Sequence, residues 1–168
     1  MLILVSGLPA SGKSYFAAAL QKTIDARYLS SDIVRSEMNL RGRYDPAIKE
    51  LVYTEMLVRA GRSLVDGQRV IVDGTFSRAA DRQRFYELAE RWQRPFFVIV
   101  IKAAEETIAQ RMTKKRAYSE ADFEVYLKIR EQYEPIGRHH LILWSDGQTL
   151  DEMLTQALDY LCISQLAG

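Results

Sequence analysis

Cysteine is almost absent from this sequence of 168 residues, which contains only Cys162. A single cysteine excludes any intramolecular disulfide, so we expect a reducing compartment and predict a cytoplasmic protein. Cys162 falls in an apolar segment near the C-terminus, where we expect a buried core residue and not a nucleophile. Internal repeats, low-complexity tracts and linkers rich in proline or glycine are also missing, which predicts one domain over residues 1–168.

Long hydrophobic runs are missing too. No apolar run approaches the roughly 18 residues that a membrane span needs, so we expect no membrane partner. No basic residue precedes the N-terminal apolar run, which argues against a signal peptide. Charge of one sign is not in excess either, because 23 Lys and Arg against 22 Asp and Glu give a formal net charge of +1. This balance argues against a wide nucleic-acid-binding face, and it is compatible with a local basic site.

The first fourteen residues carry the most informative motif of the chain. Residues 2–5 form an apolar run of the length of a buried strand. Residues 7–14, Gly-Leu-Pro-Ala-Ser-Gly-Lys-Ser, then match the phosphate-loop pattern of two glycines followed by Lys-Ser. Gly7 and Gly12 let backbone N–H groups turn inward around the phosphates of a nucleotide. Lys13 would reach the β- and γ-phosphates, and the Ser14 hydroxyl would bind Mg²⁺.

The residues that follow this motif support the same interpretation. Phe16, Leu20 and Ile24 form an apolar stripe, which predicts a helix whose N-terminus faces the bound anion. A strand before the loop and a helix after it are the context that the motif requires. The sequence therefore predicts a binding site for a nucleoside triphosphate. Its candidate nucleotide-binding residues are Gly7, Ala10, Ser11, Gly12, Lys13 and Ser14.

Apolar strands alternate with amphipathic helices along the whole chain. We expect strands at residues 2–5, 26–30, 69–73, 95–101 and 141–144, and helices after the phosphate loop and at about 31–40, 46–64, 78–93, 104–116, 119–133 and 150–161. Ser31-Asp32 and Ser77 are the expected N-caps of two of these helices. The run 95–101 is the most hydrophobic strand, which predicts a central place in the sheet. This α/β alternation predicts a parallel sheet covered on both faces, with ligands at the carboxyl ends of the strands.

Asp32 and Arg35 follow the second expected strand. A carboxylate at a strand end beside a triphosphate can accept the proton of an attacking hydroxyl. Arg35 lies one helical turn further on, where it can hold a substrate phosphate or the carboxylate itself. The alternative is a plain helix cap and a solvated arginine, and the neighbouring phosphate loop favours the catalytic interpretation.

Asp73 ends the third expected strand, where the second acidic residue of phosphate-loop enzymes helps to hold Mg²⁺. The alternative for Asp73 is a turn residue at a strand end. The next residue is Gly74 and not a glutamate that could polarise water, which counts against a hydrolytic or motor-type ATPase. No Asn-Lys-x-Asp motif occurs in the chain, which counts against a GTPase switch.

Basic residues gather at the end of the helix expected over 104–116. Their side chains can stabilise the charge that develops on a transferred phosphoryl group, or they can be a solvated helix end that complements the dipole. Arg111 is the best candidate, because it shares the helix side of the apolar residues Ile108 and Met112. The cluster consists of Arg111, Lys114, Lys115 and Arg116.

Two further sets of residues are expected to be structural. Arg78 and Arg84 lie among acidic residues and fit an ordinary charged helix face, with Arg82 as the exception that could serve a substrate phosphate. His139-His140 has no further histidine in the chain, and the single cysteine, Cys162, is expected to be a core residue, so we expect no metal site there.

Together these elements resemble the phosphate-loop kinases related to polynucleotide 5′-kinase, and equally the AAA-type kinase-like domains often fused to aminoglycoside-phosphotransferase-like domains. The resemblance extends in chain order over the phosphate loop, Ser30-Ser31-Asp32-x-x-Arg35, Val72-Asp73-Gly74-Thr75, and Arg111 with Arg116. Zeta toxins, gluconate kinases and chloramphenicol phosphotransferases are more distantly similar. Asp73-Gly74-Thr75-Phe76 is closer to the fused kinase-like group.

This resemblance implies a three-layer fold with a five-stranded parallel sheet and a mobile helical lid at about residues 111–120. It implies that Lys13 and Ser14 bind ATP and Mg²⁺, that Asp32 is the general base and that Arg35 positions the acceptor. Arg111 and Arg116 would be lid arginines on the donor phosphates. The adenine would lie between the lid and the loop over residues 145–147.

The expected activity is transfer of the ATP γ-phosphate to a hydroxyl. The acceptor stays open between a polynucleotide 5′-hydroxyl, which the Asp32–Arg35 pairing favours, and a small metabolite or drug hydroxyl, which the near-neutral charge favours. A non-catalytic ATP-binding module is the alternative of another class. The sequence leaves the oligomeric state open.

Overall fold

The computed structural model describes residues 1–114 and 120–166. Five strands in this part of the chain form one parallel sheet in the order β2-β3-β1-β4-β5. The strands are β1 (Leu2–Ser6), β2 (Arg27–Ser30), β3 (Val70–Gly74), β4 (Phe96–Lys102) and β5 (Leu141–Trp144). The helices are α1 (Lys13–Ile24), α2 (Ser31–Glu37), α3 (Pro46–Val65), α4 (Ala79–Arg91), α5 (Glu105–Lys114), α6 (Glu120–Glu131) and α7 (Leu150–Leu166).

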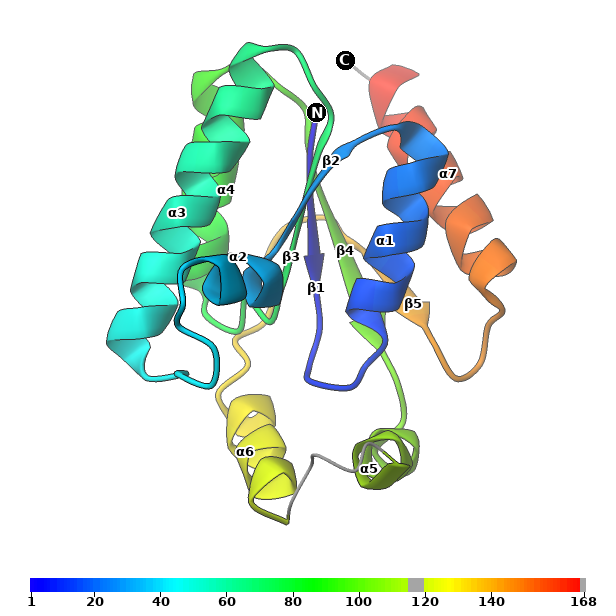
Figure 1. Cartoon of the computed structure of the whole chain (residues 1–168). Coiled ribbons are helices and arrows are strands. Elements are labelled where there is room, and N and C mark those ends of the chain that lie inside the picture. The colour runs from blue at the N-terminus through cyan, green and yellow to red at the C-terminus, as the bar shows by residue number, and fades with distance from the viewer. Residues whose placement is uncertain (115–119, 167–168) are drawn as a thin grey trace.

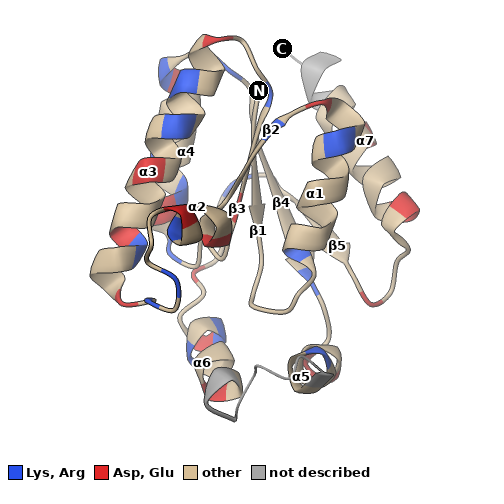
Figure 2. Cartoon of the chain, viewed as in Figure 1, with Lys and Arg blue, Asp and Glu red and all other residues tan. Residues whose placement is uncertain are grey.

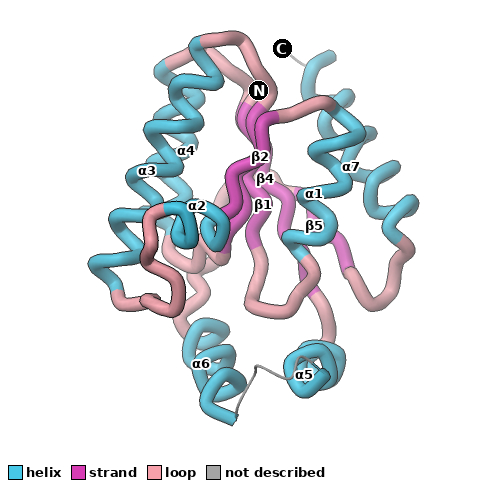
Figure 3. The backbone as a smooth tube through the Cα atoms, in the orientation of Figure 1, coloured by secondary structure: helices cyan, strands magenta, loops and turns pink. Residues whose placement is uncertain are grey.

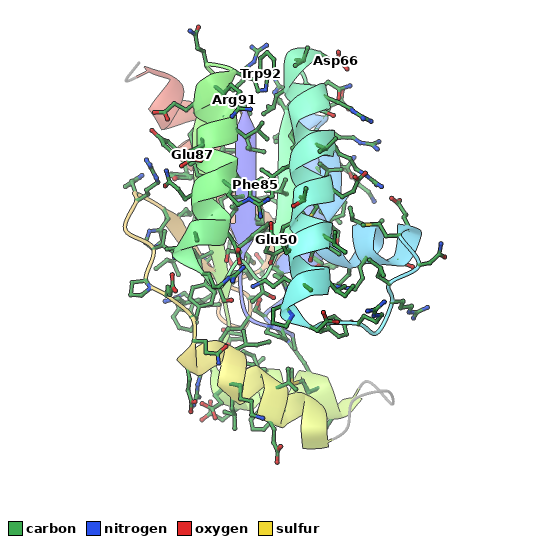
Figure 4. All side chains as sticks on the ribbon, turned by 90° about the vertical axis from the view of Figure 1, so that its left-hand side faces the viewer. Glu50, Asp66, Phe85, Glu87, Arg91 and Trp92 are labelled. Carbon is green, nitrogen blue, oxygen red and sulfur yellow. The ribbon has the colours of Figure 1, made fainter. Side chains whose placement is uncertain are left out.

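Alternation of side chains along β1 explains why helices cover both faces of the sheet. Leu2 and Leu4 point into the core under α3 and α4, whereas Ile3 and Val5 point into the core under α1 and α7. All five residues of β1 are buried, as expected for a strand with a helical layer on each side. Figure 1 shows these layers edge-on, and Figure 4 looks onto α3 and α4, which lie side by side over one face.

The expected fold class is confirmed, and so is each of the five strands. The prediction that residues 95–101 are the central strand is wrong in detail, because β1 occupies the middle and β4 lies between β1 and the edge strand β5. A continuous hydrophobic run indicates that both faces of a strand are covered. β4 meets that condition although only one strand, β5, separates it from the edge of the sheet. No helix in the described ranges has the length and apolar character to cross a membrane.

The loops at the carboxyl ends of the strands gather at one end of the molecule. α5 and α6 lie beyond that end, as the tube in Figure 3 makes plain. A third apolar cluster joins Ile108 and Met112 of α5 to Tyr126 of α6, and Leu8 and Ala10 of the loop after β1 pack against it. The packing places the α5–α6 pair directly over the first loop of the chain.

Two predicted N-caps are wrong, and long-range contacts explain one of them. α4 begins at Ala79 with Arg78 at the N-cap position and no side-chain cap, so Ser77 does not cap it. Instead the Ala79 N–H donates to Glu134 Oε2 at 2.5 Å, a carboxylate 55 residues away. α2 likewise has Ser30 at its N-cap position, and Asp32 lies in its first turn. Local sequence patterns cannot reveal a cap that arrives from another segment.

Cys162 also departs from its prediction, because its side chain is exposed. The buried residues of α7 are Met153, Ala157 and Leu161, spaced four apart along one side of the helix. Cys162 follows Leu161 by one residue, which turns it by about 100° away from that side.

Arg82 is buried and holds two distant segments together. Its Nη1 donates to the carbonyls of Phe76 at 2.7 Å and Ser77 at 3.2 Å, in the loop between β3 and α4. Its Nη2 donates to the carbonyls of Glu134 at 2.9 Å and Pro135 at 2.8 Å, after α6. A substrate role is therefore not needed to explain the burial of Arg82, since its guanidinium already donates to four carbonyl oxygens.

We expect Arg82→Ala to lower the free energy of unfolding by about 3 kcal/mol, because it leaves buried carbonyls without their charged donor. Arg84→Ala on the same helix is the control. Arg84 hydrogen-bonds to Thr54 and pairs with Glu50 at the surface, and its loss should cost less than about 1 kcal/mol. Urea unfolding of both variants measures the difference, and equal effects would refute a structural role specific to Arg82.

Candidate active site

The loop between β1 and α1 has the backbone shape that its glycines predict. Gly12 has a φ of 93°, and Ala10 has a φ of 60°. A Cβ at Gly7 would lie 2.6 Å from the carbonyl oxygen of Ile101, so no larger residue fits without displacing backbone. α1 begins at Lys13, which leaves the first N–H groups of the helix free to point toward an anion.

Asp73 lies at the end of β3, opposite Val5 of the neighbouring β1. Burial raises the pKa of its carboxyl above the usual range, while the charge of Lys13 and the hydroxyls of Ser14 and Tyr28 act in the opposite direction. Asp73 Oδ2 accepts a hydrogen bond of 2.8 Å from Tyr28. Asp73 Oδ1 is buried and has no hydrogen-bond partner within residues 1–114 and 120–166.

The Ser14 hydroxyl and the unpartnered Asp73 oxygen fit a magnesium ion. Mg²⁺ takes oxygen ligands and usually keeps several waters, with only one or two protein groups and substrate phosphates completing its shell. In the described part of the chain no three His, Cys, Asp or Glu side chains form a metal-binding group. A small site that shares its ion with a nucleotide agrees with that observation.

Arg111 of α5 connects three segments at this end of the sheet. Its Nη1 donates to the carbonyl of Ala10 at 3.1 Å and to Ser145 Oγ at 2.8 Å, and its Nη2 donates to the Ser145 carbonyl at 3.1 Å. Ser145 Oγ in turn donates to the carbonyl of Ser11 at 2.6 Å. The structure therefore brings Arg111 to the phosphate loop, beside the segment 145–147. Arg116 lies outside the described residues, as do all of residues 115–119 of the predicted lid.

Asp32 and Arg35 form an ion pair on α2, with Arg35 Nη1 2.8 Å from Asp32 Oδ1. The Asp32 side chain is 71% exposed, whereas that of Arg35 is 8% exposed. The ring of Tyr44 covers the Arg35 guanidinium at 4.5 Å. Asp32 is close enough to Asp73 for its charge to contribute to the raised pKa of that carboxyl. The pair and the phosphate loop thus both lie at the carboxyl end of the sheet, after β2 and β1 respectively.

The other predicted structural residues lie apart from this arrangement. Arg78 forms an ion pair with the buried carboxylate of Asp81, and Arg84 forms a surface ion pair with Glu50. The His139 ring packs against Tyr160, and His140 Nδ1 contacts the Arg138 carbonyl.

Sequence reasoning missed two tyrosines that contact the site. Tyr28 in β2 reaches Asp73, and Tyr44 in the α2–α3 loop covers Arg35. Tyr44 lies between Arg43 and Asp45 in a short basic segment, and that association of an aromatic with arginines was the available signal. For Tyr28 the signal was weaker, since a tyrosine in an edge strand usually only packs.

The parallel sheet, the phosphate loop and the helices over it define a P-loop kinase-like fold. A family model described as an AAA domain, AAA_33, matches residues 2–136, and the chain belongs to this family.

Solved structures share the whole architecture at low sequence identity. The APS kinase CysC of Mycobacterium tuberculosis, solved with AMPPNP and APS, is 19% identical with a TM-score of 0.73 over 95% of this chain and 96% of that one. A gluconokinase from Sinorhizobium meliloti 1021 is 18% identical with a TM-score of 0.73, covering 95% and 90%. Kti12 of Chaetomium thermophilum, solved with ADP-AlF3, is 21% identical with a TM-score of 0.73, covering 95% and 98%.

We expect Lys13→Ala to abolish most ATP binding and leave the fold intact. The ammonium makes a single long hydrogen bond, 3.5 Å to the Leu8 carbonyl, so its loss removes little internal structure. Titration calorimetry with ATP and thermal unfolding measure the two effects. Lys22→Ala near the other end of α1 is the matched control, and it should bind ATP normally. An unimpaired Lys13→Ala protein would remove the phosphate-loop interpretation.

Asp73→Asn should weaken the Mg²⁺-dependent part of ATP binding, with partial rescue at high metal concentration, because a neutral amide is a poorer partner for the ion or its water. ATP affinity in EDTA should change little. The measurement is a pair of ATP titrations with and without Mg²⁺. Unchanged binding at limiting Mg²⁺ would make Asp73 a strand-end residue with no metal role.

Proposed function

We propose that this protein is an ATP-dependent kinase that transfers the γ-phosphate to a hydroxyl acceptor. The observation that carries the proposal is the exposed carboxylate of Asp32. It is paired with Arg35 at the carboxyl end of the sheet, where the phosphate loop also lies. Nucleotide binding alone needs no such carboxylate. The non-catalytic ATP-binding module is therefore the weaker alternative.

On the donor side, the backbone N–H groups at residues 7–14 and the Lys13 ammonium would hold the phosphates of ATP. Ser14 and Asp73 would hold Mg²⁺, which neutralises charge on the β- and γ-phosphates when bound. Arg111 would add positive charge beside the loop, where charge develops on the phosphoryl group. Its contacts with the Ala10 carbonyl and Ser145 support this role, because they fix the guanidinium in place. A similar role for Arg116 stays a prediction.

On the acceptor side, Asp32 would take the proton of the attacking hydroxyl. The oxygen of that hydroxyl forms a bond to the γ-phosphorus while the bond from phosphorus to the β–γ bridging oxygen breaks, and ADP leaves. Arg35 Nη1 donates to Asp32 Oδ1, and this bond would hold the carboxylate in position for that role.

For the acceptor we propose a polynucleotide 5′-hydroxyl. The support is a basic segment with an exposed aromatic ring beside the candidate base, made of Arg41, Arg43 and Tyr44 between α2 and α3. Figure 2 shows the basic residues of this segment next to α2. Stacking on an aromatic ring together with positive charge is how proteins bind single-stranded nucleic acid. The net charge of +1 favours the alternative, a small metabolite or drug hydroxyl.

The experiment that decides between acceptors is incubation with labelled ATP and two panels, one of 5′-hydroxyl oligonucleotides and one of small alcohols. Label in the oligonucleotides supports the proposal, and label in a small alcohol supports the alternative. ATP binding without transfer to either panel would favour the non-catalytic module.

Asp32→Asn should reduce turnover by on the order of 10² to 10⁴ and leave ATP affinity close to normal. The reason is positional, because the carboxylate would act on the acceptor while the phosphate loop holds the donor. Steady-state kinetics together with direct ATP titration test it. Normal turnover, or a loss explained by failed ATP binding, would refute the mechanism.

Arg35→Ala should instead raise the acceptor KM along with any loss of kcat, because Arg35 would act through binding as well as through charge. Kinetics with both substrates varied separate the two effects. A change confined to the KM for ATP would contradict an acceptor role. Arg84→Ala, which removes a surface cation of α4 outside the proposed acceptor site, is the control for a general effect of charge.

A further inference from the structure

The hydroxyl of Tyr28 contacts the buried carboxylate of Asp73. Tyr28 lies in β2 opposite Ile71 of β3, two positions before Ser30, which lies opposite Asp73. Side chains two residues apart on a strand share a face. Tyr28 and Ile71 both pack in the core under α1, so the phenol extends along this face toward the start of α1. Its Oη donates to Asp73 Oδ2 at 2.8 Å.

The two carboxylate oxygens of Asp73 therefore differ in their hydrogen bonding. Oδ2 is occupied by Tyr28, whereas Oδ1 is buried and has no partner among the described residues. A buried acceptor without a partner is costly unless a ligand or water completes it. The Ser14 hydroxyl approaches the same carboxylate. The free oxygen is therefore the one available to an ion held near Ser14.

We propose that Tyr28 is a positioning residue for the divalent metal that accompanies the nucleotide. By holding Oδ2 it fixes the rotation of the Asp73 carboxylate and presents Oδ1 alone to the ion or to a water on the ion. This inference rests on the proposed function, since it needs a nucleotide–metal site at the phosphate loop.

A purely structural role for Tyr28 makes a different prediction. If the residue only fills space beside α1, phenylalanine replaces it without consequence for the metal, because the ring is kept and only the hydroxyl is lost. Partners that orient metal ligands typically contribute on the order of 10- to 100-fold to metal affinity. Tyr28→Phe is therefore the variant that separates the two roles.

The test is ATP binding by calorimetry in EDTA and in Mg²⁺, and Mn²⁺ binding in the presence of ATP by electron paramagnetic resonance. For Tyr28→Phe we expect an unchanged Kd for ATP in EDTA. In Mg²⁺ the Kd should rise on the order of 10-fold, with a similar weakening of Mn²⁺. Tyr160→Phe is the matched control, because it loses a hydroxyl in the same core, where Oη donates to the His139 carbonyl.

Combination with Asp73→Asn tests whether Tyr28 acts through Asp73. The double variant should bind Mg²⁺–ATP no more weakly than Asp73→Asn alone, because in this proposal the hydroxyl acts on the ion through Asp73 and not through its interaction with Ser14. Additive losses would refute action through Asp73, and a normal Mg²⁺ dependence in Tyr28→Phe would refute the proposal itself. Weaker binding in EDTA to the same extent as in Mg²⁺ would make Tyr28 a structural support of the loop. Failure of the unmodified protein to bind ATP would overturn the proposed function instead.

Discussion

Burial of a carboxylate at the end of β3 is the constraint on which the candidate site depends. Removing a charged group from water is expensive, and Asp73 is compensated by a phenol, a serine hydroxyl and a nearby ammonium. Each comes from a different element: Tyr28 from β2, Ser14 and Lys13 from the start of α1. The compensation holds only if β2, β3 and α1 keep their relative positions. The phosphate loop is thus tied to the sheet through polar contacts as well as through the apolar core beneath α1.

The α5–α6 pair is held over the loop from both of its ends. Before α5, the Ala104 N–H donates to Asp146 Oδ2 at 2.6 Å. After α6, Tyr133 Oη lies 2.5 Å from Ser6 Oγ at the end of β1, and the Glu134 N–H donates to the Ser77 carbonyl at 2.8 Å. Arg82 completes the second attachment through its four carbonyls. A displacement of α6 would therefore move the end of β1 and the loop after Asp73, both of which lie near the candidate metal site.

Sequence patterns predicted most of the fold because each strand is short, apolar and followed by an amphipathic helix. The positions of the phosphate loop, Asp73 and Arg111 followed from the same logic, and Arg111 does contact that loop. What escaped prediction depends on contacts between distant segments. Glu134 replaces Ser77 at the start of α4, and four carbonyls from two loops surround Arg82. Tyr28 is another case, because its role requires knowing that β2 lies beside β3.

Under the proposed function, different parts of the chain would form the donor and acceptor sides of the site. Solved structures with this fold are described as a gluconokinase and as an APS kinase, so the shared architecture carries no information about the acceptor. Residues that choose the acceptor must then lie outside the phosphate loop. In this chain α2 and the segment up to Asp45 meet that condition, because Asp32 is exposed there and Tyr44 covers Arg35. Asp32, Arg35 and Tyr44 place a carboxylate, a cation and an aromatic ring within one short segment of the chain. Under the proposed function, a hydroxyl that reaches Asp32 would belong to a molecule that also meets the other two groups.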